Sequence, residues 1–209
     1  KLVDNRVKFY QASSSDMFGN IDDLPITINT QMKPISPYAV SKASSHWSVV
    51  CYRESYSLFA VSGILFNHES KLRTNNLFIK KVISDSVDIS LGIKDVLYVG
   101  NINIKRDFGY APKYVEAMWL MLQQDTPKDY LICSGRSIKL RDIVEYVFDE
   151  LNIPKEKIVV DDMLYRPTEM DDIYGDNSLA KNELQWSYDM NFFDVLKKLI
   201  EHEVVSRKN

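Results

Sequence analysis

Two short stretches near the start of the chain carry side chains that could transfer protons. Residues 11–19 read QASSSDMFG, and they end an apolar run with three hydroxyls and a carboxylate. Residues 36–42 read SPYAVSK, and they place Tyr38 and Lys42 four positions apart. Residues at that spacing share a face of a helix, where the positive charge of a lysine favours the phenolate form of a tyrosine. A phenolate can act as a general base toward a sugar hydroxyl.

Neither stretch is specific by itself. The chain has 12 tyrosines, so a tyrosine and a lysine can fall at this spacing by chance. Serine and aspartate are also preferred at helix N-caps and in turns, so Ser14 and Asp16 fit a cap as well as a site. Ligands of open α/β sheets bind at the carboxyl ends of strands. At such an end Ser14 would hydrogen-bond a substrate oxygen, and Asp16 would move a proton.

Other polar and cationic side chains are spread along the chain. Residues 66–70 (FNHES) follow a second apolar run and indicate either a site or a loop with a satisfied histidine. Scattered cations usually form a solvated surface, but a set from distant segments can converge on a diphosphate. The cationic candidates are Arg73, Lys80, Lys81, Lys105 and Arg106 (in KRDFG), and Arg166 (in YRPTE, which also contains Glu169).

Apolar strands that alternate with amphipathic helices must position these groups, so we predict an α/β architecture. In the helix predicted at 38–56, the apolar positions Val40, Ala43, Trp47, Val50 and Cys51 recur every three or four residues. Residues 161–176 read as an irregular acidic loop. The predicted strands are 7–12, 59–66, 96–99, 130–133 and 158–160, and the other predicted helices are 77–91, 113–124, 137–151, 178–184 and 191–206.

The bulk composition narrows the class of protein. The 209 residues, 45% hydrophobic and 26% charged, suit one large globular domain or two small ones. A net charge of -3 gives no reason to expect nucleic acid or an anionic membrane as a partner, and no apolar run could span a bilayer. With three histidines and no CxxC motif we predict no metal site. We expect Cys51 and Cys133 to be buried, reduced thiols of a cytoplasmic protein.

When these segments are considered together, the chain resembles the GDP-mannose 4,6-dehydratase family of the extended short-chain dehydrogenase/reductase superfamily. The motifs FYQASSSDMFG, SPYAVSK, YRESYSLFAVSGILFNHES, GNINIKRDFGYAPKYVEAMWLMLQ and YRPTEMD carry the resemblance over nearly the whole chain. The family uses NADP to oxidise C4 of GDP-mannose, eliminates water across C5 and C6, and reduces C6. The product, GDP-4-keto-6-deoxymannose, is a precursor of fucose. The resemblance implies that residues 1–91 are the later part of a Rossmann-like, doubly wound parallel sheet, and that residues 92–209 mainly form a GDP-sugar-binding lobe.

The resemblance also implies a role for each matched residue. Tyr38 takes the proton of the 4-hydroxyl, and Lys42 is its charged partner. Ser14 stands where the family usually has threonine and donates to the 4-oxygen, while Asp16 stands where the family has the glutamate that works at C5 and C6. The implied cofactor contacts are Lys42, His68 and Arg73, and the implied GDP-sugar contacts are Asn67, Lys81, Arg106, Arg166 and Glu169.

Three features depart from the family pattern. Asp16 is one methylene shorter than glutamate, and a misplacement of about 1 Å can cost roughly a hundredfold in rate. Residues 71–75 read KLRTN where the family has Pro-Arg-Arg-Gly-Glu, in the segment that joins the cofactor site to a neighbouring subunit of the family's homo-oligomer. The glycine-rich phosphate loop is not found. We therefore expect the carboxyl-terminal part of such an enzyme, inactive alone and, with an open apolar strand edge, poorly soluble or oligomeric.

Other functions share part of this pattern. A GDP-mannoheptose 4,6-dehydratase is the nearest alternative, since the altered residues could accommodate an extra carbon. A sugar-nucleotide epimerase has the same tyrosine and lysine but does not usually need a carboxylate at Asp16. A catalytically inactive GDP-sugar-binding module would bind but never turn over, even with the amino-terminal half supplied. A plain structural α/β domain is least favoured, because several independent segments match at once.

Overall fold

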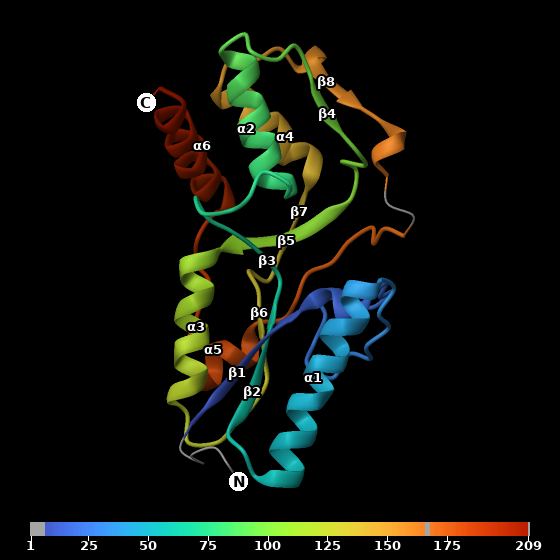
Figure 1. Ribbon diagram of the computed structural model, residues 1–209, viewed down its shortest axis with the longest axis vertical. Coiled ribbons are helices and arrows are strands. Elements are labelled where there is room, and N and C mark those ends of the chain that lie inside the picture. The colour runs from blue at the N-terminus through green and yellow to red at the C-terminus, as the bar shows by residue number, and fades with distance from the viewer. Residues whose placement is uncertain (1–6, 166–167, 209) are drawn as a thin grey trace.

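The computed structural model describes residues 7–165 and 168–208, which alternate strands and helices (Figure 1). Short 3₁₀ turns lie at Ser15–Phe18, Lys155–Lys157 and Asp162–Leu164. The strands are β1 (Phe9–Ser14), β2 (Ala60–Leu65), β3 (Asn67–Glu69), β4 (Leu97–Val99), β5 (Lys105–Tyr110), β6 (Tyr130–Ile132), β7 (Ser137–Lys139) and β8 (Ile158–Val160). The helices are α1 (Pro37–Tyr56), α2 (Phe78–Ser90), α3 (Ala111–Gln123), α4 (Leu140–Glu150), α5 (Ser178–Leu184) and α6 (Phe192–Lys208).

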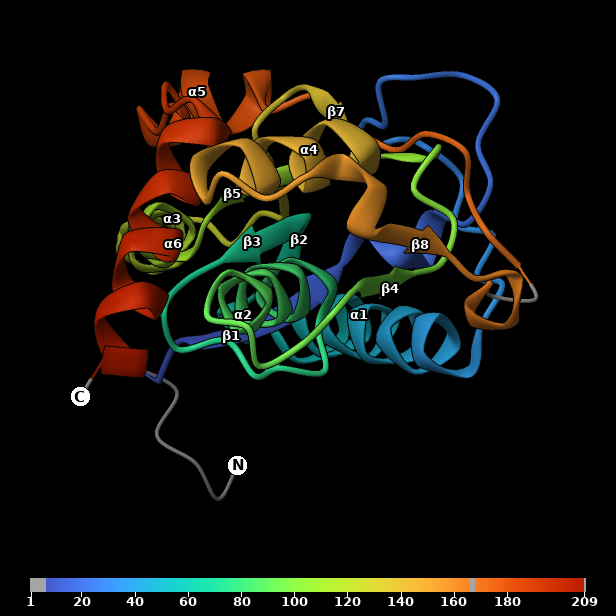
Figure 2. The same cartoon turned by 90° about the horizontal axis from the view of Figure 1, so that it is seen from above.

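The lower part of the molecule in Figure 1 is a parallel sheet in the order β1-β2-β6. Every residue of β2 is buried. A parallel strand buried on both faces needs a helical layer on each side. α1 lies on one side of the sheet, and α3 and α5 lie on the other (Figures 1 and 2).

The upper part holds the other strands and three helices. β3 runs parallel to β5, β5 runs antiparallel to β7, and β4 pairs in parallel with β8. α2, α4 and α6 pack together on one apolar core that includes Ile79, Val147 and Leu196. α2 belongs to this upper core, so the packing crosses the boundary expected at residue 91. The division into 1–91 and 92–209 stays a prediction.

The structure departs from the predicted elements at the β7–α4 junction. Residues 137–139 were expected to open a helix, and this is wrong, because they form β7 and pair with β5. The helix begins only at Leu140, whose backbone N–H donates to Ile104. Hydrogen bonds to the neighbouring strand prevail here over a local helical pattern.

The apolar positions that recur along α1 do not all lie on its buried face. The helix buries Ala39, Ala43, His46 and Val49, whereas Trp47 is 56% exposed. Apolar residues occupy two sides of this helix, and the sheet covers one of them. Consequently Cys51 is exposed and only Cys133 is buried, which corrects the expectation of two buried thiols.

A helix cap at one end and an ion pair at the other fix α1 against the sheet. At its start the Ser36 hydroxyl accepts the backbone N–H of Ala39 at 3.1 Å, and Pro37 occupies the first turn. At its end the guanidinium of Arg53 binds both carboxylate oxygens of Asp129 at 2.8 Å. One of those oxygens also accepts the N–H of Ser62 in β2 at 2.6 Å. The orientation of α1, and of every side chain on its first turns, is therefore set at both ends.

β1 borders an open groove. β2 is its strand partner within the described ranges. The groove beside it measures about 470 Å³ and is largely apolar. Its lining includes Phe9, Val49, Tyr52 and Leu58. No helix in the part of the chain that the structure describes has the length and apolarity needed to cross a membrane.

Candidate active site

A cavity of about 520 Å³ lies where β1 and β2 end, and we call it the strand-end cavity. It forms there because β1 and β2 are parallel and in register to their last residues, with Ser14 opposite Leu65. The first turns of α1 close one side. Its lining includes nine of the sequence-predicted residues, namely Ser14, Asp16, Tyr38, Lys42, Asn67, His68, Arg73, Arg106 and Glu169.

The β1 side of this cavity is a tight 3₁₀ turn. The Ser14 hydroxyl accepts the backbone N–H of Asp16 at 3.3 Å, so Ser14 is an N-cap as well as a cavity residue. Met17 and Phe18 follow and are fully buried. These two buried side chains fix the backbone that carries Asp16. The sequence left a cap and a site as alternatives; the cap is present, and both Ser14 and Asp16 line the cavity.

Tyr38 and Lys42 face the same cavity from α1. Tyr38 is 53% exposed, so its hydroxyl is accessible to a ligand. The Lys42 ammonium lies 5.7 Å from the centre of the tyrosine ring. It also donates to the backbone carbonyl of Ala12 at 2.8 Å, which ties it to β1. A positive charge is thus fixed near Tyr38, whose side chain lines the same cavity as Ser14 and Asp16.

A second cavity of about 350 Å³, the upper cavity, lies between the start of α2 and the β4–β5 connection. It adjoins the strand-end cavity. Lys81, the remaining described substrate candidate, lines it. Arg166 lies outside the described residues. The residues that line both cavities are Asn67, Arg73, Leu77, Arg106 and Glu169.

The polar residues of the upper cavity are anchored to backbone and to one another. Lys81 donates to the carbonyl of Tyr98 at 2.6 Å, and Arg106 donates to that of Met170 at 2.6 Å. Glu169 accepts from the Asn101 amide at 2.8 Å. Two other cations from the sequence candidates line neither cavity. Lys80 pairs with Glu203, and Lys105 pairs with Asp172 at 3.6 Å.

His68 presents one fixed tautomer to the strand-end cavity. Its Nδ1 lies 2.8 Å from the carbonyl of Phe66, which can only accept, so Nδ1 carries the proton and Nε2 is an acceptor. Burial lowers the pKa of His68, and the nearby Arg73 lowers it further. The imidazole is therefore neutral at pH 7. Its ring packs against the fully buried ring of Tyr114, with 5.0 Å between the ring centres and 33° between the ring planes.

Gly109 makes this support possible. A Cβ atom at position 109 would lie 2.2 Å from Cε2 of Tyr114. We expect Gly109→Ala to lower the free energy of unfolding by about 1–3 kcal/mol, because the tyrosine ring has no room to retreat from the added methyl. Urea denaturation measures this. The penalty should shrink in a Tyr114→Leu background, and an equal penalty in both backgrounds would contradict the explanation.

Asp107 is a buried carboxylate that ties the loops behind the site to β5. It has no exposed surface. It accepts backbone N–H groups from Ser134 at 2.8 Å, Gly135 at 3.0 Å and Gly175 at 3.5 Å. Its backbone carbonyl accepts from the amide of Asn67 at 3.1 Å, so the same residue holds a side chain that lines both cavities.

This carboxylate should leave a signature in the pH dependence of stability. Burial raises the pKa of Asp107 from 3.8 to about 6, against the opposing effect of its N–H donors. Between about pH 4 and pH 6 the folded protein then keeps a proton that the unfolded chain releases. The free energy of unfolding should therefore fall as pH rises through this window, by up to about 3 kcal/mol from this group, and not change further above it.

Denaturation of the Asp107→Asn variant at pH 4, 5, 6 and 7 tests this signature. The variant should lose the decrease in unfolding free energy between pH 4 and pH 6 that this group contributes. Asp125→Asn, at an exposed carboxylate, is the control and should keep the wild-type profile. Identical pH profiles for wild type and Asp107→Asn would show that the carboxyl does not titrate in this window.

The sequence interpretation assigned no role to three residues that shape the site. Asn101 holds Glu169, Asp107 holds Asn67, and Glu69 pairs with Arg73 at 3.2 Å. Asn101, Asp107 and Glu69 all stand inside the motifs that carry the resemblance, but the roles of Asn101 and Asp107 depend on contacts with distant segments. Among the described residues, no three His, Cys, Asp or Glu side chains gather in a way that could hold a metal ion.

The fold defines the class of protein first. A solved structure described as RMD from Pseudomonas aeruginosa complexed with NADPH matches with a TM-score of 0.87 at 22% identity, over 95% of this chain and 67% of that one. A dTDP-glucose 4,6-dehydratase from Bacillus anthracis matches with a TM-score of 0.81 at 21% identity, over 93% and 60%. The chain thus has the α/β fold with parallel sheets of these two structures, over part of their length.

The family follows from the sequence comparison. The family model described as GDP-mannose 4,6 dehydratase matches residues 1–199, and the chain belongs to this family. The GDP-mannose 4,6 dehydratase of Dictyostelium discoideum is 39% identical over 99% of this chain and 63% of its own length. The chain spans 53% to 63% of the length of the curated relatives it matches. The resemblance read from the motifs is confirmed at the level of the family.

Proposed function

We propose that the chain provides the catalytic and GDP-sugar-binding part of an NADP-dependent GDP-mannose 4,6-dehydratase, a lyase. The observation that carries the proposal is the strand-end cavity, whose lining includes Ser14, Asp16, Tyr38, Lys42 and His68. Next to it, the upper cavity has Arg73, Lys81 and Arg106 in its lining. A neutral sugar and its diphosphate require such a division between proton-transfer groups and cations.

Each catalytic side chain has a defined task in this proposal. Tyr38 takes the proton of the 4-hydroxyl, and Ser14 donates a hydrogen bond to the same oxygen. A 4-ketone makes the hydrogen at C5 acidic, so Asp16 removes it as a proton. The protonated Asp16 then gives this proton to the C6 hydroxyl, which leaves as water. When C6 is reduced, C5 must take up a proton, which Asp16 delivers after it has been re-protonated from solvent. The proton that Tyr38 took from the 4-hydroxyl returns to solvent, which closes the proton balance. Bound NADP would supply the hydride acceptor for C4 and the hydride donor for C6.

The residues present fit a part of NADP. His68 is neutral and offers Nε2 as an acceptor, which suits an uncharged polar group of a nicotinamide nucleotide. Lys42 and Arg73 line the same cavity and suit ribose and phosphate oxygens. These three residues would hold the reactive end of the cofactor close to Tyr38.

The proposal assigns the rest of the cofactor site to a segment that the chain does not contain. No glycine-rich phosphate loop occurs in the sequence, and the curated relatives are longer. The edge of β1 that pairs with no strand of the described residues, and the apolar groove beside it, would accept further parallel strands and a helix. In this view the chain is the carboxyl-terminal part of the family enzyme, and dehydratase activity needs the remaining part.

Complementation tests the function. The chain is co-expressed with the part of the Dictyostelium relative that it does not span, NADP and GDP-mannose are added, and the 4-keto-6-deoxy product is measured by mass spectrometry. The two corresponding parts of the relative itself, co-expressed in the same way, are the positive control. Product from the control alone, with GDP bound by a folded complex, would identify the chain as an inactive GDP-sugar-binding module.

The same assay distinguishes GDP-mannose from the nearest alternative substrate, GDP-mannoheptose. GDP-mannoheptose carries one more carbon beyond C6 than GDP-mannose. Competition between the two sugars in one reaction gives the ratio of their kcat/KM values directly. We expect GDP-mannose to be preferred, and a preference for the heptose would reassign the substrate without changing the chemistry.

A further inference from the structure

One cation of the candidate active site is held by a buried carboxylate. Arg73 lines both the strand-end cavity and the upper cavity. Its Nε donates to Oε2 of Glu69 at 3.2 Å. Lys42 in the strand-end cavity and Lys81 in the upper cavity donate instead to backbone carbonyls. A carboxylate next to a cation in a cavity for anions lowers the local positive potential, so its presence needs a reason.

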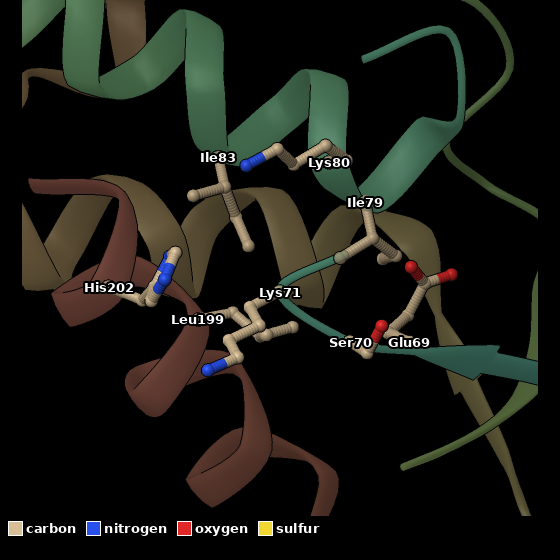
Figure 3. A pocket seen from close by; sticks show the side chains of 8 residues that line it. All are labelled: Glu69, Ser70, Lys71, Ile79, Lys80, Ile83, Leu199 and His202. Atoms are coloured by element: carbon tan, nitrogen blue, oxygen red, sulfur yellow. The ribbon is translucent and has the colours of Figure 1, made fainter. Parts of the chain in front are cut away.

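Glu69 is rigidly placed. It is the last residue of β3, it is paired in register with Tyr110 of β5, and it is 3% exposed. Figure 3 shows its carboxylate beside Ile79 at the start of α2, across a small cavity from His202 and the ammonium of Lys71. Burial raises the pKa of Glu69, and the charge and hydrogen bond of Arg73 counteract this.

The loop that carries Arg73 offers the side chain little other support. It consists of two successive turns, closed by the bonds from the Arg73 N–H to Ser70 at 3.2 Å and from the Leu77 N–H to Thr74 at 3.3 Å. Leu72, the neighbour of Arg73, is 83% exposed. Among the described residues, Glu69 is the partner that fixes the direction of the arginine side chain.

The bond to Glu69 uses one edge of the guanidinium. It engages Nε, and no described residue accepts from either terminal nitrogen. Two terminal N–H groups in a rigid plane match a pair of phosphate oxygens. Because Arg73 lines both cavities, these groups lie where the two cavities adjoin.

We propose that Glu69 is a positioning residue, which orients Arg73 so that its two terminal nitrogens bind a phosphate group at the junction of the strand-end and upper cavities. The proposal rests on the proposed function for the source of that phosphate. It belongs either to the diphosphate of a GDP-sugar or to NADP.

Orientation and simple charge predict opposite effects when Glu69 is neutralised. Glu69→Gln removes a negative charge from beside the site, so charge alone would tighten the binding of a phosphate ligand. If orientation dominates, the loss of a charge-assisted bond to Nε frees the arginine, and binding weakens by about tenfold. The sign of the change therefore decides between the two effects.

The test is a double-variant cycle measured by calorimetry, with GDP and NADP as separate ligands of the full chain. Wild type, Glu69→Gln, Arg73→Ala and the double variant are compared. We expect Glu69→Gln to weaken one ligand about tenfold, and to have no further effect in the Arg73→Ala background. The ligand that shows this coupling is the source of the phosphate.

Glu203→Gln is the matched control. The Glu203 side chain is 6% exposed and that of Glu69 is 4% exposed. Glu69 pairs with Arg73, whereas Glu203 pairs with Lys80 and also with Arg207 at 3.4 Å. Glu203 lines neither of the two cavities. The control variant should lower the melting temperature and leave both dissociation constants unchanged.

Three results would overturn the proposal. These are tighter binding by Glu69→Gln, a Glu69→Gln effect that persists in full without Arg73, and no binding of GDP or NADP by the wild-type chain. Its failure is distinguishable from failure of the proposed function, because the latter is measured as product in the complementation assay. Product formation together with an additive cycle would refute the positioning role alone.

Discussion

Replacement of Tyr38 by phenylalanine is expected to lower product formation in the complemented enzyme by about 10²–10⁴-fold, the usual contribution of a positioned proton-transfer group. The variant removes one oxygen and leaves the ring in place. Tyr38 is half exposed on the first turn of a capped helix, so the fold does not depend on its hydroxyl. GDP affinity should therefore stay at the wild-type value while turnover falls.

The control for this variant lies on the same helix. Tyr56 is 68% exposed, against 53% for Tyr38, and it lines neither the strand-end cavity nor the groove beside β1. Tyr56→Phe should retain full turnover. Loss of activity in both variants would point to a disturbed helix, and full activity in Tyr38→Phe would remove Tyr38 from the mechanism.

The sequence predicts the elements whose apolar content is high. The run at 59–66 contains β2, which is buried throughout, and the serine and proline at 36 and 37 mark the observed start of α1. These signals are local. They need only the apolar pattern and the chemistry of a cap, both of which can be read over a few residues.

The missed elements are stabilised by distant partners. β3, β5 and β7 are short or polar strands, and no apolar alternation marks them. Each exists because β5 lies between the other two and completes their backbone hydrogen bonds. The buried face of α1 could not be read for a related reason. The helix is apolar on two sides, and the sequence does not say which side meets the sheet.

The candidate site also has features that the sequence predicts and features that it does not. Residues drawn from segments as distant as Ser14 and Glu169 gather at one cavity, and the principle that ligands bind at the carboxyl ends of strands predicts that place. The individual roles of Ser14, Asp16, Tyr38 and Lys42 come from the family resemblance and stay predictions. Glu69 and Asp107 act through other side chains, and such roles depend on contacts that spacing cannot reveal.

Asp16 is the residue whose shorter side chain puts the chemistry in question. Its backbone is held from both directions, by the Ser14 hydroxyl on one side and by the fully buried Met17 and Phe18 on the other. Gly19, with φ of 66°, closes the turn by donating to the carbonyl of Asp16 at 3.2 Å. A fixed backbone cannot advance to replace a missing methylene, so the carboxylate ends about 1 Å short of a glutamate at this position.

Asp16→Asn and Asp16→Glu are therefore expected to change turnover in opposite directions. The asparagine cannot accept the C5 proton, so product formation in the complemented enzyme should fall by about 10²–10⁴-fold. Incorporation of solvent deuterium at C5 should disappear with it. The glutamate restores the reach, and turnover should rise by up to about a hundredfold. Asp22→Asn, at an exposed carboxylate that lines neither cavity, should behave as wild type.

The pair of variants also separates a slow enzyme from a binding module. If wild type is slow and Asp16→Glu is faster, the rest of the site is competent and the shorter carboxylate limits the rate. If both are inactive while GDP still binds, the altered segment around Arg73 has removed the cofactor function, since the side chain at position 16 no longer differs from that of the family. Equal activity of wild type and Asp16→Asn would exclude this residue as the C5 base, and the carboxylate would have to be sought at Glu169, which lines the same cavity.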